Sequence, residues 1–328
     1  MLNNKTILIT GGTGSFGRAF VAYLLENYPE IKKIVIFSRD EQKQYQMAKL
    51  FSPKEYPIKY LLGDIRDALR VDEVTRGIDI VIHACAMKHV PASEQNPMEC
   101  IKTNILGSQN IINSSMLNGV KQVVALSTDK SVSPINVYGA SKLLLEKLFV
   151  FADIEKMEQD IKFSVVRYGN IFGSSGSVVP FFIKQKEQGF LPITSEKMTR
   201  FSITMRESIE LVMYALRYSW GGEIIVPIAP SYRILDIAKA IAPNIEHRIV
   251  GIRNGEKLDE IMLSKDESCH SVRKDNYYII APVDAHWNRD EYIVKTGATK
   301  LNDNFEYISC DNDNWLGEED ILRLINGL

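Results

Sequence analysis

A glycine-rich segment directly after the first apolar run constrains the fold of this chain more than any other feature. Residues 6–9 predict a buried strand, and residues 11–17 read Gly-Gly-Thr-Gly-Ser-Phe-Gly. Glycine permits a tight turn at Gly11, close approach of backbone amides to a ligand at Gly14, and close packing of the next helix at Gly17. Residues 18–26 carry an amphipathic helical pattern, so the segment predicts a Rossmann-type strand, turn and helix. The alternative is a glycine-rich turn that binds nothing.

The first half of the chain alternates short apolar runs with amphipathic stretches. This pattern predicts parallel strands joined by helices, and therefore an α/β fold with a doubly wound, parallel Rossmann-type sheet over residues 1–169. After a sixth strand the alternation decays, and residues 170–328 predict a smaller, mixed α/β substrate lobe with some segments returning to the first domain. The expected strands are residues 6–9, 34–37, 60–62, 80–82, 123–126, 163–167 and 223–228, and the expected helices include residues 18–26, 100–117 and 206–218.

Composition excludes several classes of protein. The 328 residues are 45% hydrophobic and 24% charged, with a formal net charge of -2, which offers no electrostatic attraction for nucleic acid or an anionic membrane. The first ten residues lack the pattern of a signal peptide and no apolar run is long enough to span a bilayer, so we expect a cytoplasmic protein. The four cysteines are scattered and the histidines His83 and His89 are isolated, so we expect reduced thiols and no metal site.

The end of the second predicted strand indicates the type of dinucleotide. Helix amino termini bind phosphates, and enzymes that use NAD place an acidic residue about 20 residues after the glycine turn, on the ribose 2'-hydroxyl. This chain has Ser38 and Arg39 there, with Lys43 one turn later. Arginine suits a 2'-phosphate, so we expect NADP. Asp40 leaves the alternative open, because its carboxylate could reach the ribose and permit NAD.

Asp64 follows the third predicted strand in the segment Gly-Asp-Ile-Arg-Asp. This is the place where a carboxylate receives the adenine amino group, and Asp64 is a candidate for that contact. The alternative is that Asp64 caps the next helix.

Tyr138 and Lys142 form a Tyr-x-x-x-Lys pattern shortly after the fifth predicted strand. Residues four apart are neighbours on a helix, so the Lys142 ammonium would lie beside the Tyr138 phenol and the nicotinamide ribose. We expect its charge to lower the pKa of the phenol, so that Tyr138 removes a proton from a sugar hydroxyl as hydride leaves. The pattern is common by chance, but here it follows a glycine fingerprint and a strand that ends in Ser127 and Thr128.

The glycine and Tyr-x-x-x-Lys patterns together resemble the extended short-chain dehydrogenase/reductase family. Further segments resemble the inverting UDP-N-acetylglucosamine 4,6-dehydratases, which begin pseudaminic acid synthesis, and the resemblance runs from Lys5 to the region of Asp311 and Asn312. Related capsule-pathway dehydratases carry Met in place of Tyr138. The segments are Ser-Arg-Asp-Glu at 38–41, Ala-Met-Lys-His-Val-Pro at 86–91, Asn-Pro at 96–97, Lys-Thr-Asn at 102–104, Ser-Thr-Asp-Lys at 127–130, Arg-Tyr-Gly-Asn at 167–170, Met-Thr-Arg-Phe at 198–201 and Gly-Glu-Lys-Leu at 255–258.

The resemblance implies a mechanism without net redox change. Tyr138 and NADP⁺ oxidise C4, Lys130 is the candidate base at C5, Asp129 is the acid for the departing C6 hydroxyl, and hydride returns to C6. A neutral lysine and a protonated aspartic acid require shifted pKa values, which a desolvated cleft could provide. The alternative is that Asp129 and Lys130, which are adjacent in sequence, form only an ion pair in a loop. The catalytic set implied is Thr128, Asp129, Lys130, Tyr138 and Lys142.

The resemblance also implies binding residues and an oligomer. We expect a UDP-sugar substrate and a homo-oligomer, with a hexamer as one option. The residues implied for the cofactor are Gly11, Thr13, Gly14, Ser15, Phe16, Gly17, Ser38, Arg39, Lys43, Asp64, Ile65, Ala84, Ala86, Lys88, Ser127, Tyr138, Lys142 and Tyr168. Those implied for the substrate are Lys88, Asn170, Val178, Arg200, Arg253 and Glu256, although each arginine could instead join a structural ion pair.

Four positions depart from the family pattern. Ser175 stands where arginine is usual, Ser202 replaces a tryptophan, Gln95 an aromatic residue and Asp259 a histidine. These departures leave the catalytic set intact but weaken the inference that the sugar is UDP-N-acetylglucosamine. Two alternatives stay open: a nucleotide-sugar epimerase or reductase, which needs no acid and base at 129 and 130, and a protein that binds nucleotides without catalysis.

Overall fold

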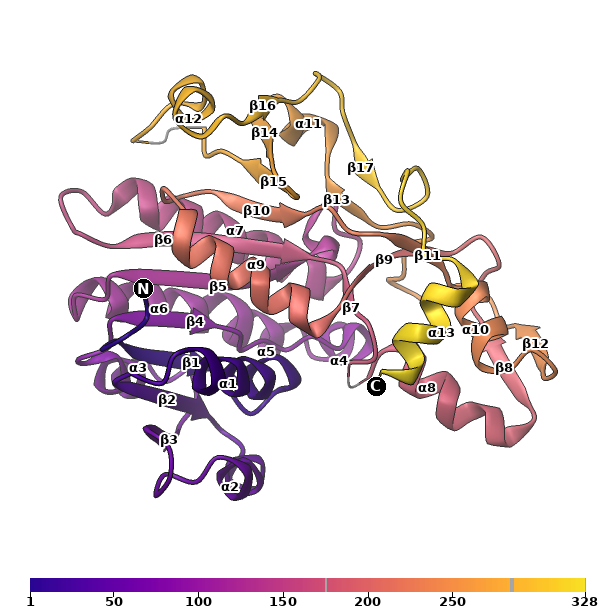
Figure 1. Ribbon diagram of the computed structural model, residues 1–328, viewed down its shortest axis with the longest axis horizontal. Helices are drawn as coiled ribbons and strands as arrows, with labels where there is room; N and C mark the ends of the chain where they lie inside the picture. Colours follow the sequence, from indigo (N-terminus) through magenta and orange to yellow (C-terminus); the bar gives the residue numbers. More distant parts are fainter. Residues whose placement is uncertain (175, 284–285, 328) are drawn as a thin grey trace.

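A parallel sheet forms the centre of the molecule in the computed structural model, which describes residues 1–174, 176–283 and 286–327 (Figure 1). Within these residues, ten strands pair in the order β16-β14-β15-β10-β6-β5-β4-β1-β2-β3. All strands from β3 to β10 in this order run parallel. Their bounds are β1 Thr6–Thr10, β2 Lys33–Ser38, β3 Ile58–Leu62, β4 Ile80–His83, β5 Gln122–Thr128, β6 Lys162–Tyr168 and β10 Ile224–Pro227.

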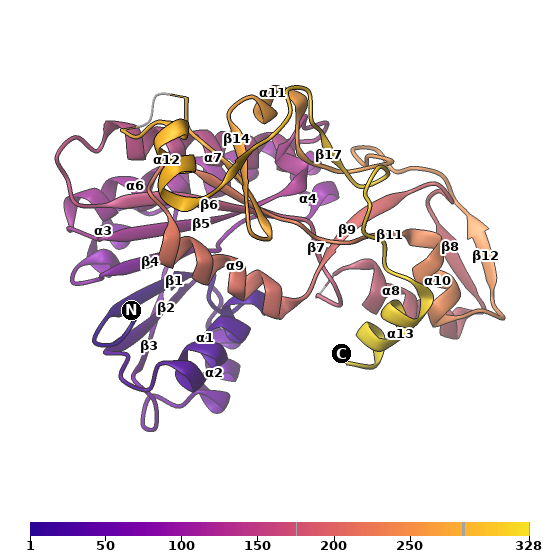
Figure 2. The ribbon, with the colours of Figure 1, turned by 45° about the horizontal axis from the view of Figure 1, so that its top comes forward.

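Helices cover both faces of this sheet (Figures 1 and 2). Successive side chains of β1 alternate, so that Ile7 and Ile9 pack in one buried apolar cluster and Leu8 packs in another. The first cluster includes α1 (Ser15–Asn27) and α9 (Met205–Tyr218), and the second includes α3 (Ala68–Thr75), α6 (Gly107–Leu117) and α7 (Val137–Glu155). The prediction of a doubly wound α/β fold is therefore confirmed.

Part of the second half of the chain returns to the large sheet. The predicted helix at 206–218 and strand at 223–228 are present as α9 and β10, and β10 pairs with β6. The sheet continues through antiparallel strands β15 (Tyr277–Ile280), β14 (Ser271–Lys274) and β16 (Thr299–Lys300), next to α12 (Arg289–Thr296). Figure 1 shows these yellow and orange segments along the upper edge of the sheet. The domain boundary at residues 169 and 170 stays a prediction.

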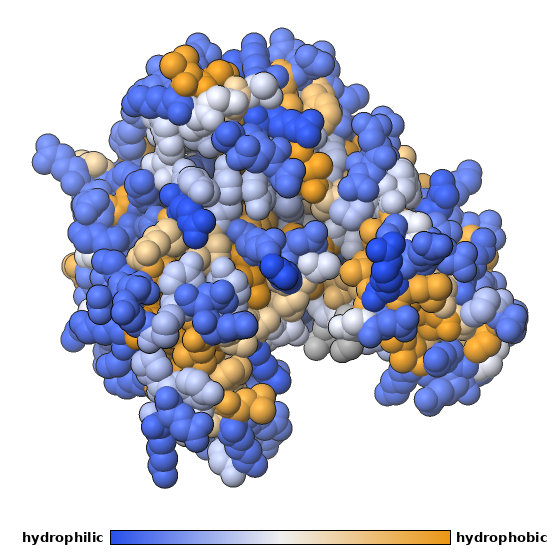
Figure 3. Space-filling view, in the orientation of Figure 1, coloured by the Kyte–Doolittle hydropathy of each residue, from blue (hydrophilic) through white to orange (hydrophobic). Residues whose placement is uncertain are grey.

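A smaller lobe projects from the sheet and has its own apolar cluster. Phe182, Leu191, Ile237 and Ile321 are buried together there. The space-filling view shows this lobe as a separate bulge, with apolar surface over α13 and α8 (Figure 3). Its elements are β7 Asn170–Ile171, α8 Val178–Gln185, η3 Lys186–Gln188, β8 Phe190–Ile193, β9 Thr199–Ile203, β11 Ser231–Arg233, α10 Ile234–Ile241, β12 Glu246–Ile249 and α13 Glu318–Asn326.

The helix predicted over residues 100–117 contains an unexpected π-helical turn. Helix α5 ends at Ile101, the π turn η1 covers Lys102–Leu106, and α6 begins at Gly107. A Cβ atom on Gly107 would lie 2.7 Å from the Ile65 side chain, so glycine permits this close packing. The remaining elements are α2 Glu41–Leu50, α4 Val90–Gln95, α5 Pro97–Ile101, the 3₁₀ turn η2 Asp129–Ser131, β13 Ile261–Leu263, α11 Lys265–Ser268 and β17 Tyr307–Ile308. Across the described residues, no helix is long and apolar enough to cross a bilayer.

Arg167 is a buried guanidinium that joins three elements. On β6 it donates to both carboxylate oxygens of Glu146 on α7, at 2.9 and 2.7 Å. It donates to both oxygens of Glu267 on α11, at 3.0 and 2.7 Å, and to the carbonyl of Met262. Glu146 also accepts a hydrogen bond from Ser131, in the turn after β5. The network therefore connects the end of the sheet to the chain around residue 265.

We predict that Arg167→Met destabilises the protein by about 3–5 kcal/mol, because two carboxylates lose their cation inside the fold. Urea unfolding followed by circular dichroism measures the loss. The matched control is Arg206→Met on α9, whose pair with Glu210 is largely exposed and contributes at most about 1 kcal/mol. Equal stability losses in the two variants would contradict the prediction.

Candidate active site

The glycine turn has the geometry that a phosphate site needs. Gly11 has φ +65°, and a Cβ atom there would lie 2.8 Å from the Cα of Cys85, so a side chain is excluded. A Cβ atom on Gly17 would overlap the backbone of Gly12. Helix α1 begins after Gly14, which has no side chain to cap the first turn. The amino terminus of this helix therefore offers backbone amides to an anion.

The other predicted residues of this turn have structural contacts as well. The Thr13 side chain is buried, and the carbonyl of Thr13 accepts a hydrogen bond from Arg18 at 3.0 Å. Phe16 packs against Phe20 with 5.5 Å between ring centres. Ser15 is the first residue of α1. The sequence pattern thus identified a turn that the fold holds from several sides.

His83 connects β4 to β1 and α6 below this turn. Its Nδ1 lies 2.8 Å from Thr10 Oγ1, and its Nε2 lies 3.0 Å from Ser108 Oγ. Burial, with the charge of Lys142 as a second cause, lowers the pKa of His83 to about 3. His83 is therefore a neutral hydrogen-bonding residue. Among the described residues no group of His, Cys, Asp and Glu side chains could hold a metal ion.

At the end of β2 the Arg39 side chain is exposed, whereas the neighbouring Asp40 is bonded within the helix that follows. Arg39 reaches only to 3.9 Å from Asp64, and its side chain is 68% exposed. Asp40 caps helix α2 by accepting from the amide of Lys43, and it pairs with the Lys43 ammonium at 3.3 Å. Ser38 accepts from Gln44 through both its carbonyl and its hydroxyl. The carboxylate of Asp40, which would favour NAD, is thus already bonded to Lys43 in helix α2.

Asp64 is held by Arg66, and the alternative that it caps a helix is wrong. The residue that caps α3 is Asp67, because it is the residue directly before the helix and its carboxylate accepts from the amide of Arg70. Asp64 accepts from the Arg66 side chain at 2.9 and 2.7 Å. Burial opposes ionisation, but the hydrogen bonds from Arg66 hold the pKa of Asp64 below its usual value. Ile65 is buried, and its carbonyl accepts from Asn110.

Asn104 in the π turn fixes the segment that follows β4. Its amide accepts from Met87 N at 2.7 Å, donates to Met87 O at 2.9 Å and donates to Ser141 Oγ on α7 at 2.8 Å. The π turn places this side chain between two segments, and sequence reasoning assigned it no role. Ala84 and Ala86 are partly buried in the same segment, whereas Lys88 is exposed.

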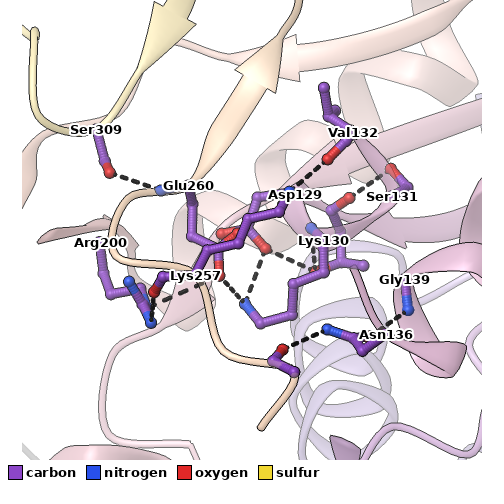
Figure 4. A network of polar contacts seen from close by, with 12 residues as sticks. Asp129, Lys130, Ser131, Val132, Asn136, Gly139, Arg200, Lys257, Glu260 and Ser309 are labelled. Carbon is purple, nitrogen blue, oxygen red and sulfur yellow. Dashed lines mark hydrogen bonds and ion pairs between the residues drawn. The ribbon is translucent and has the colours of Figure 1, made fainter. Parts of the chain in front are cut away.

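The carboxyl end of β5 carries the acid and base candidates (Figure 4). Asp129 is fully buried, and its Oδ1 accepts from Thr128 Oγ1 at 2.8 Å and from Lys130 Nζ at 3.1 Å. Within the described chain, Asp129 Oδ2 has no hydrogen-bond partner. Since a buried carboxylate oxygen is rarely left bare, this atom marks an unfilled hydrogen-bond position at the end of β5.

Tyr138 and Lys142 lie on α7, whose first turn is capped by Asn136. Lys142 donates to the carbonyl of Leu126 at 2.5 Å, and burial lowers its pKa to about 8. Burial raises the pKa of Tyr138 to about 12, while Lys130 and Thr128 act in the opposite direction. The expected lowering of this pKa by Lys142 is therefore wrong for the protein alone, since desolvation dominates and Lys130 is the cation that acts on the phenol. Two further predicted cofactor residues, Ser127 and Tyr168, are also buried at the ends of β5 and β6.

Lys130 is a cation held between two carboxylates. Its Nζ lies 3.1 Å from Asp129 and 3.0 Å from Glu260, which is nearly inaccessible to solvent. Burial would lower the pKa of Lys130, but Asp129 and Glu260 together raise it well above its usual range. Burial in the cleft therefore does not by itself give the resting protein a neutral Lys130. Sequence reasoning missed Glu260, because a single glutamate more than 100 positions away carries no spacing signal.

A cavity of about 350 Å³ opens beside Lys130. Five of the six predicted substrate residues line it, and Lys88 does not. Arg200 is buried there and donates to the carbonyls of Thr199, Lys257 and Leu258. In the described part of the chain, Asn170 Oδ1 and Glu256 Oε2 have no hydrogen-bond partner. The five residues are Asn170, Val178, Arg200, Arg253 and Glu256.

Three of the four departures from the family pattern can be placed. Ser202 is buried in β9, Gln95 is exposed at the end of α4, and Asp259 accepts from Thr199 Oγ1 at 2.5 Å. None of the three lines the cavity beside Lys130. Ser175 lies outside the described residues.

Comparison with known proteins gives the family. A family model described as "Polysaccharide biosynthesis protein" matches residues 7–282. The chain belongs to this family. The chain is 48% identical over 332 residues to an inverting UDP-N-acetylglucosamine 4,6-dehydratase of Campylobacter jejuni, covering 99% of this chain and 98% of that protein. The resemblance to inverting dehydratases of the extended short-chain dehydrogenase/reductase family is thereby confirmed.

Two further relatives share the length of the chain. A UDP-glucose 4-epimerase of Rickettsia bellii is 41% identical over 336 residues, covering 100% of this chain and 97% of that protein. The crystal structure of Pen from Bacillus thuringiensis has a TM-score of 0.90 and 33% identity, covering 100% of this chain and 98% of that one. The family therefore includes proteins named for different reactions, and the site residues have to distinguish them.

We predict that acid weakens this fold through His83. The pKa of His83 is about 3 in the folded chain against a usual 6.5, so the unfolded chain binds the proton more tightly. Stability is therefore lost as pH falls from 6.5 toward 3, by up to about 1.4 kcal/mol per pH unit. Urea unfolding of wild type and His83→Gln at several pH values isolates this contribution. Parallel pH dependence in the two proteins would show that His83 does not carry it.

Proposed function

We propose that this protein catalyses the NADP-dependent 4,6-dehydration of UDP-N-acetylglucosamine with inversion at C5, as a hydro-lyase. The observation that carries the proposal is the ion pair of Asp129 with Lys130, which lies beside Tyr138 and whose lysine lines the cavity. An acid and a base at this place serve an elimination, whereas C4 oxidation alone requires only Tyr138 and Lys142. The identity to named dehydratases along nearly the whole chain supports it.

A nicotinamide dinucleotide fits the residues present. The glycine turn excludes side chains at Gly11 and Gly17, the N-cap of α1 is a glycine, and Arg39 is exposed at the end of β2. When bound, the nicotinamide would take hydride from C4 of the sugar and return it to C6. Ser127, Tyr138 and Lys142 would orient the ribose and the sugar hydroxyl. Tyr138 would receive the C4 hydroxyl proton as a phenolate, a form that the charge of Lys130 favours. Arg39 with Lys43 favours a 2'-phosphate, and hence NADP.

The cavity residues suit a nucleotide-activated sugar. Arg253 lines the cavity with a largely exposed side chain and can donate to a diphosphate. Arg200 adds positive charge there, because its guanidinium already donates to backbone carbonyls. The bare oxygens of Asn170 and Glu256 in the cavity lining, and that of Asp129 next to Lys130, are acceptors for sugar hydroxyl or amide groups. We also propose, from the resemblance, a homo-oligomer in the cytoplasm that acts at the first step of a pseudaminic-acid-like surface-glycan pathway.

A second candidate is the 4-epimerisation of a UDP-hexose. The Rickettsia bellii relative named as an epimerase favours it. This reaction returns hydride to C4 and loses no water, so it has no use for an acid and base pair at Asp129 and Lys130. The two reactions are separated by the mass of the product, which falls by one water only in dehydration.

We predict that Arg39→Ala weakens NADP binding about ten- to a hundredfold and leaves NAD binding nearly unchanged, because the variant loses charge-assisted hydrogen bonds to the 2'-phosphate. Isothermal titration of each cofactor gives the two dissociation constants. Lys33→Ala, at the opposite end of β2, is the control and should bind both cofactors as wild type does. Equal losses for NADP and NAD in Arg39→Ala would contradict the assignment.

We predict that wild type converts UDP-N-acetylglucosamine to a product lighter by one water, and that Lys130→Ala does so about 10² to 10⁴ times more slowly. The variant retains Tyr138 and Lys142, so it should still oxidise C4 but fail to exchange the C5 proton with deuterated water. Mass spectrometry and proton NMR of the product measure both effects. Release of dehydrated sugar by Lys130→Ala at the wild-type rate would show that Lys130 is not the base and has only a structural role in its ion pairs.

A further inference from the structure

Glu260 is a buried carboxylate that shares the cavity with Lys130. Its Oε1 lies 3.0 Å from Lys130 Nζ and 3.8 Å from Arg200 Nε. In the part of the chain that the structure describes, Oε2 of Glu260 has no hydrogen-bond partner. Burying a carboxylate whose second oxygen makes no hydrogen bond costs free energy, so we expect such a group to have a functional role.

The backbone of Glu260 is fixed by the chain around it. Its amide donates to Ser309 Oγ at 2.9 Å, and its carbonyl accepts from the Ser309 amide at 2.9 Å. Ser309 Oγ lies 2.6 Å from Thr199 Oγ1 on β9. Figure 4 shows the Glu260 side chain extending from this anchor toward Lys130 and Arg200. The carboxylate therefore has a defined position at the cavity.

The charges around Lys130 leave it protonated at rest. Lys257 opposes the ammonium, together with Arg200, whereas Asp129 and Glu260 stabilise it. An ammonium cannot accept the C5 proton, so the proton on Lys130 has to move before elimination. The ionisable groups that act on Lys130 from all packed elements are Asp129, Tyr138, Arg200, Tyr232, Lys257 and Glu260.

We propose that Glu260 is a positioning residue that holds the Lys130 ammonium against Asp129, so that one proton passes between these two groups and prepares both for elimination. The inference rests on the dehydratase function proposed above. It assigns the proton a source inside the site, because Lys130 Nζ lies 3.1 Å from Asp129 Oδ1.

The proton transfers balance within the site. Transfer from Lys130 Nζ to Asp129 leaves an amine and a carboxylic acid. The amine then takes the C5 proton of the 4-keto sugar, and the electron pair of the broken C5–H bond forms the C5–C6 double bond. The C6–O bond breaks, and the proton of Asp129 leaves with that oxygen as water. Lys130 is again an ammonium and Asp129 a carboxylate, so no proton from solvent is consumed.

The test compares wild type with Glu260→Gln, which removes a negative charge beside Lys130 and keeps the shape of the side chain. Lys142, whose pKa is about 8, gives the kcat profile a first basic limb. Activity also requires the proton shared by Asp129 and Lys130, so the profile steepens into a second basic limb at the pH where Lys130 gives that proton up. We expect this basic limb of the kcat profile to move at least about one pH unit lower in Glu260→Gln. Competitive acetylation of Lys130, followed by peptide mass spectrometry, should shift by a similar amount because only the neutral amine reacts.

Three further variants make the result specific. Glu260→Asp restores the charge and should restore most of the wild-type basic limb. Glu260→Ala removes the charge without placing an amide in the cavity, and it should repeat the acetylation shift even if turnover is lost. Glu223→Gln is the matched control: an equally buried carboxylate that accepts from the amides of Trp220 and Gly221 and does not line the cavity. It should leave both pH profiles unchanged.

The outcomes separate the two proposals. If wild type dehydrates the sugar and the neutral variants at 260 keep the wild-type limb and acetylation midpoint, the role of Glu260 is refuted and the dehydratase function stands. If wild type consumes UDP-N-acetylglucosamine without loss of water, the dehydratase function fails. An acetylation shift without dehydration would confine Glu260 to setting the charge of Lys130 and would overturn the elimination step.

Discussion

The buried guanidinium of Arg167 is the interaction on which the arrangement of the site depends. It neutralises Glu146 and Glu267 in the interior, and each carboxylate makes two hydrogen bonds to it. Glu146 in turn accepts from Ser131, which lies next to Lys130. Because buried charges tolerate little displacement of their partners, this network fixes α7, β6 and the turn after β5 relative to one another.

Buried charges are also paired next to the cavity, where they belong to the proposed catalytic groups. Two carboxylates and two cations lie together there, so their formal charges cancel within a small volume. They are Asp129, Glu260, Lys130 and Arg200. Cancellation lowers the cost of burying each group, while Asp129 and Glu260 each keep one oxygen without a hydrogen-bond partner in the described chain. In the Arg167 network, by contrast, both oxygens of Glu146 and both oxygens of Glu267 are bonded to the guanidinium. Structural and functional charge clusters in this protein differ in that respect.

The local patterns predicted the strands and the glycine turn well because each depends on neighbours in sequence. Alternation along β1 and the spacing of Tyr138 and Lys142 follow from strand and helix periods alone. The π turn at Asn104, the cap formed by Asp67 rather than Asp64, and the use of Asp40 by its own helix were not predicted. Each of these depends on competition between several possible hydrogen-bond partners, which only the packed chain decides.

By itself the sequence determined the doubly wound sheet, the order of its motifs and the candidates at residues 128 to 142, because hydrophobic period and glycine conformation act over a few residues. Tertiary structure decided the electrostatics of those candidates. It raised the pKa of Tyr138 by burial and left Lys130 a cation between Asp129 and Glu260. It also decided which of the later strands join the large sheet, namely β10, β14, β15 and β16. These outcomes depend on desolvation and on charges brought together from distant positions, which no local pattern records.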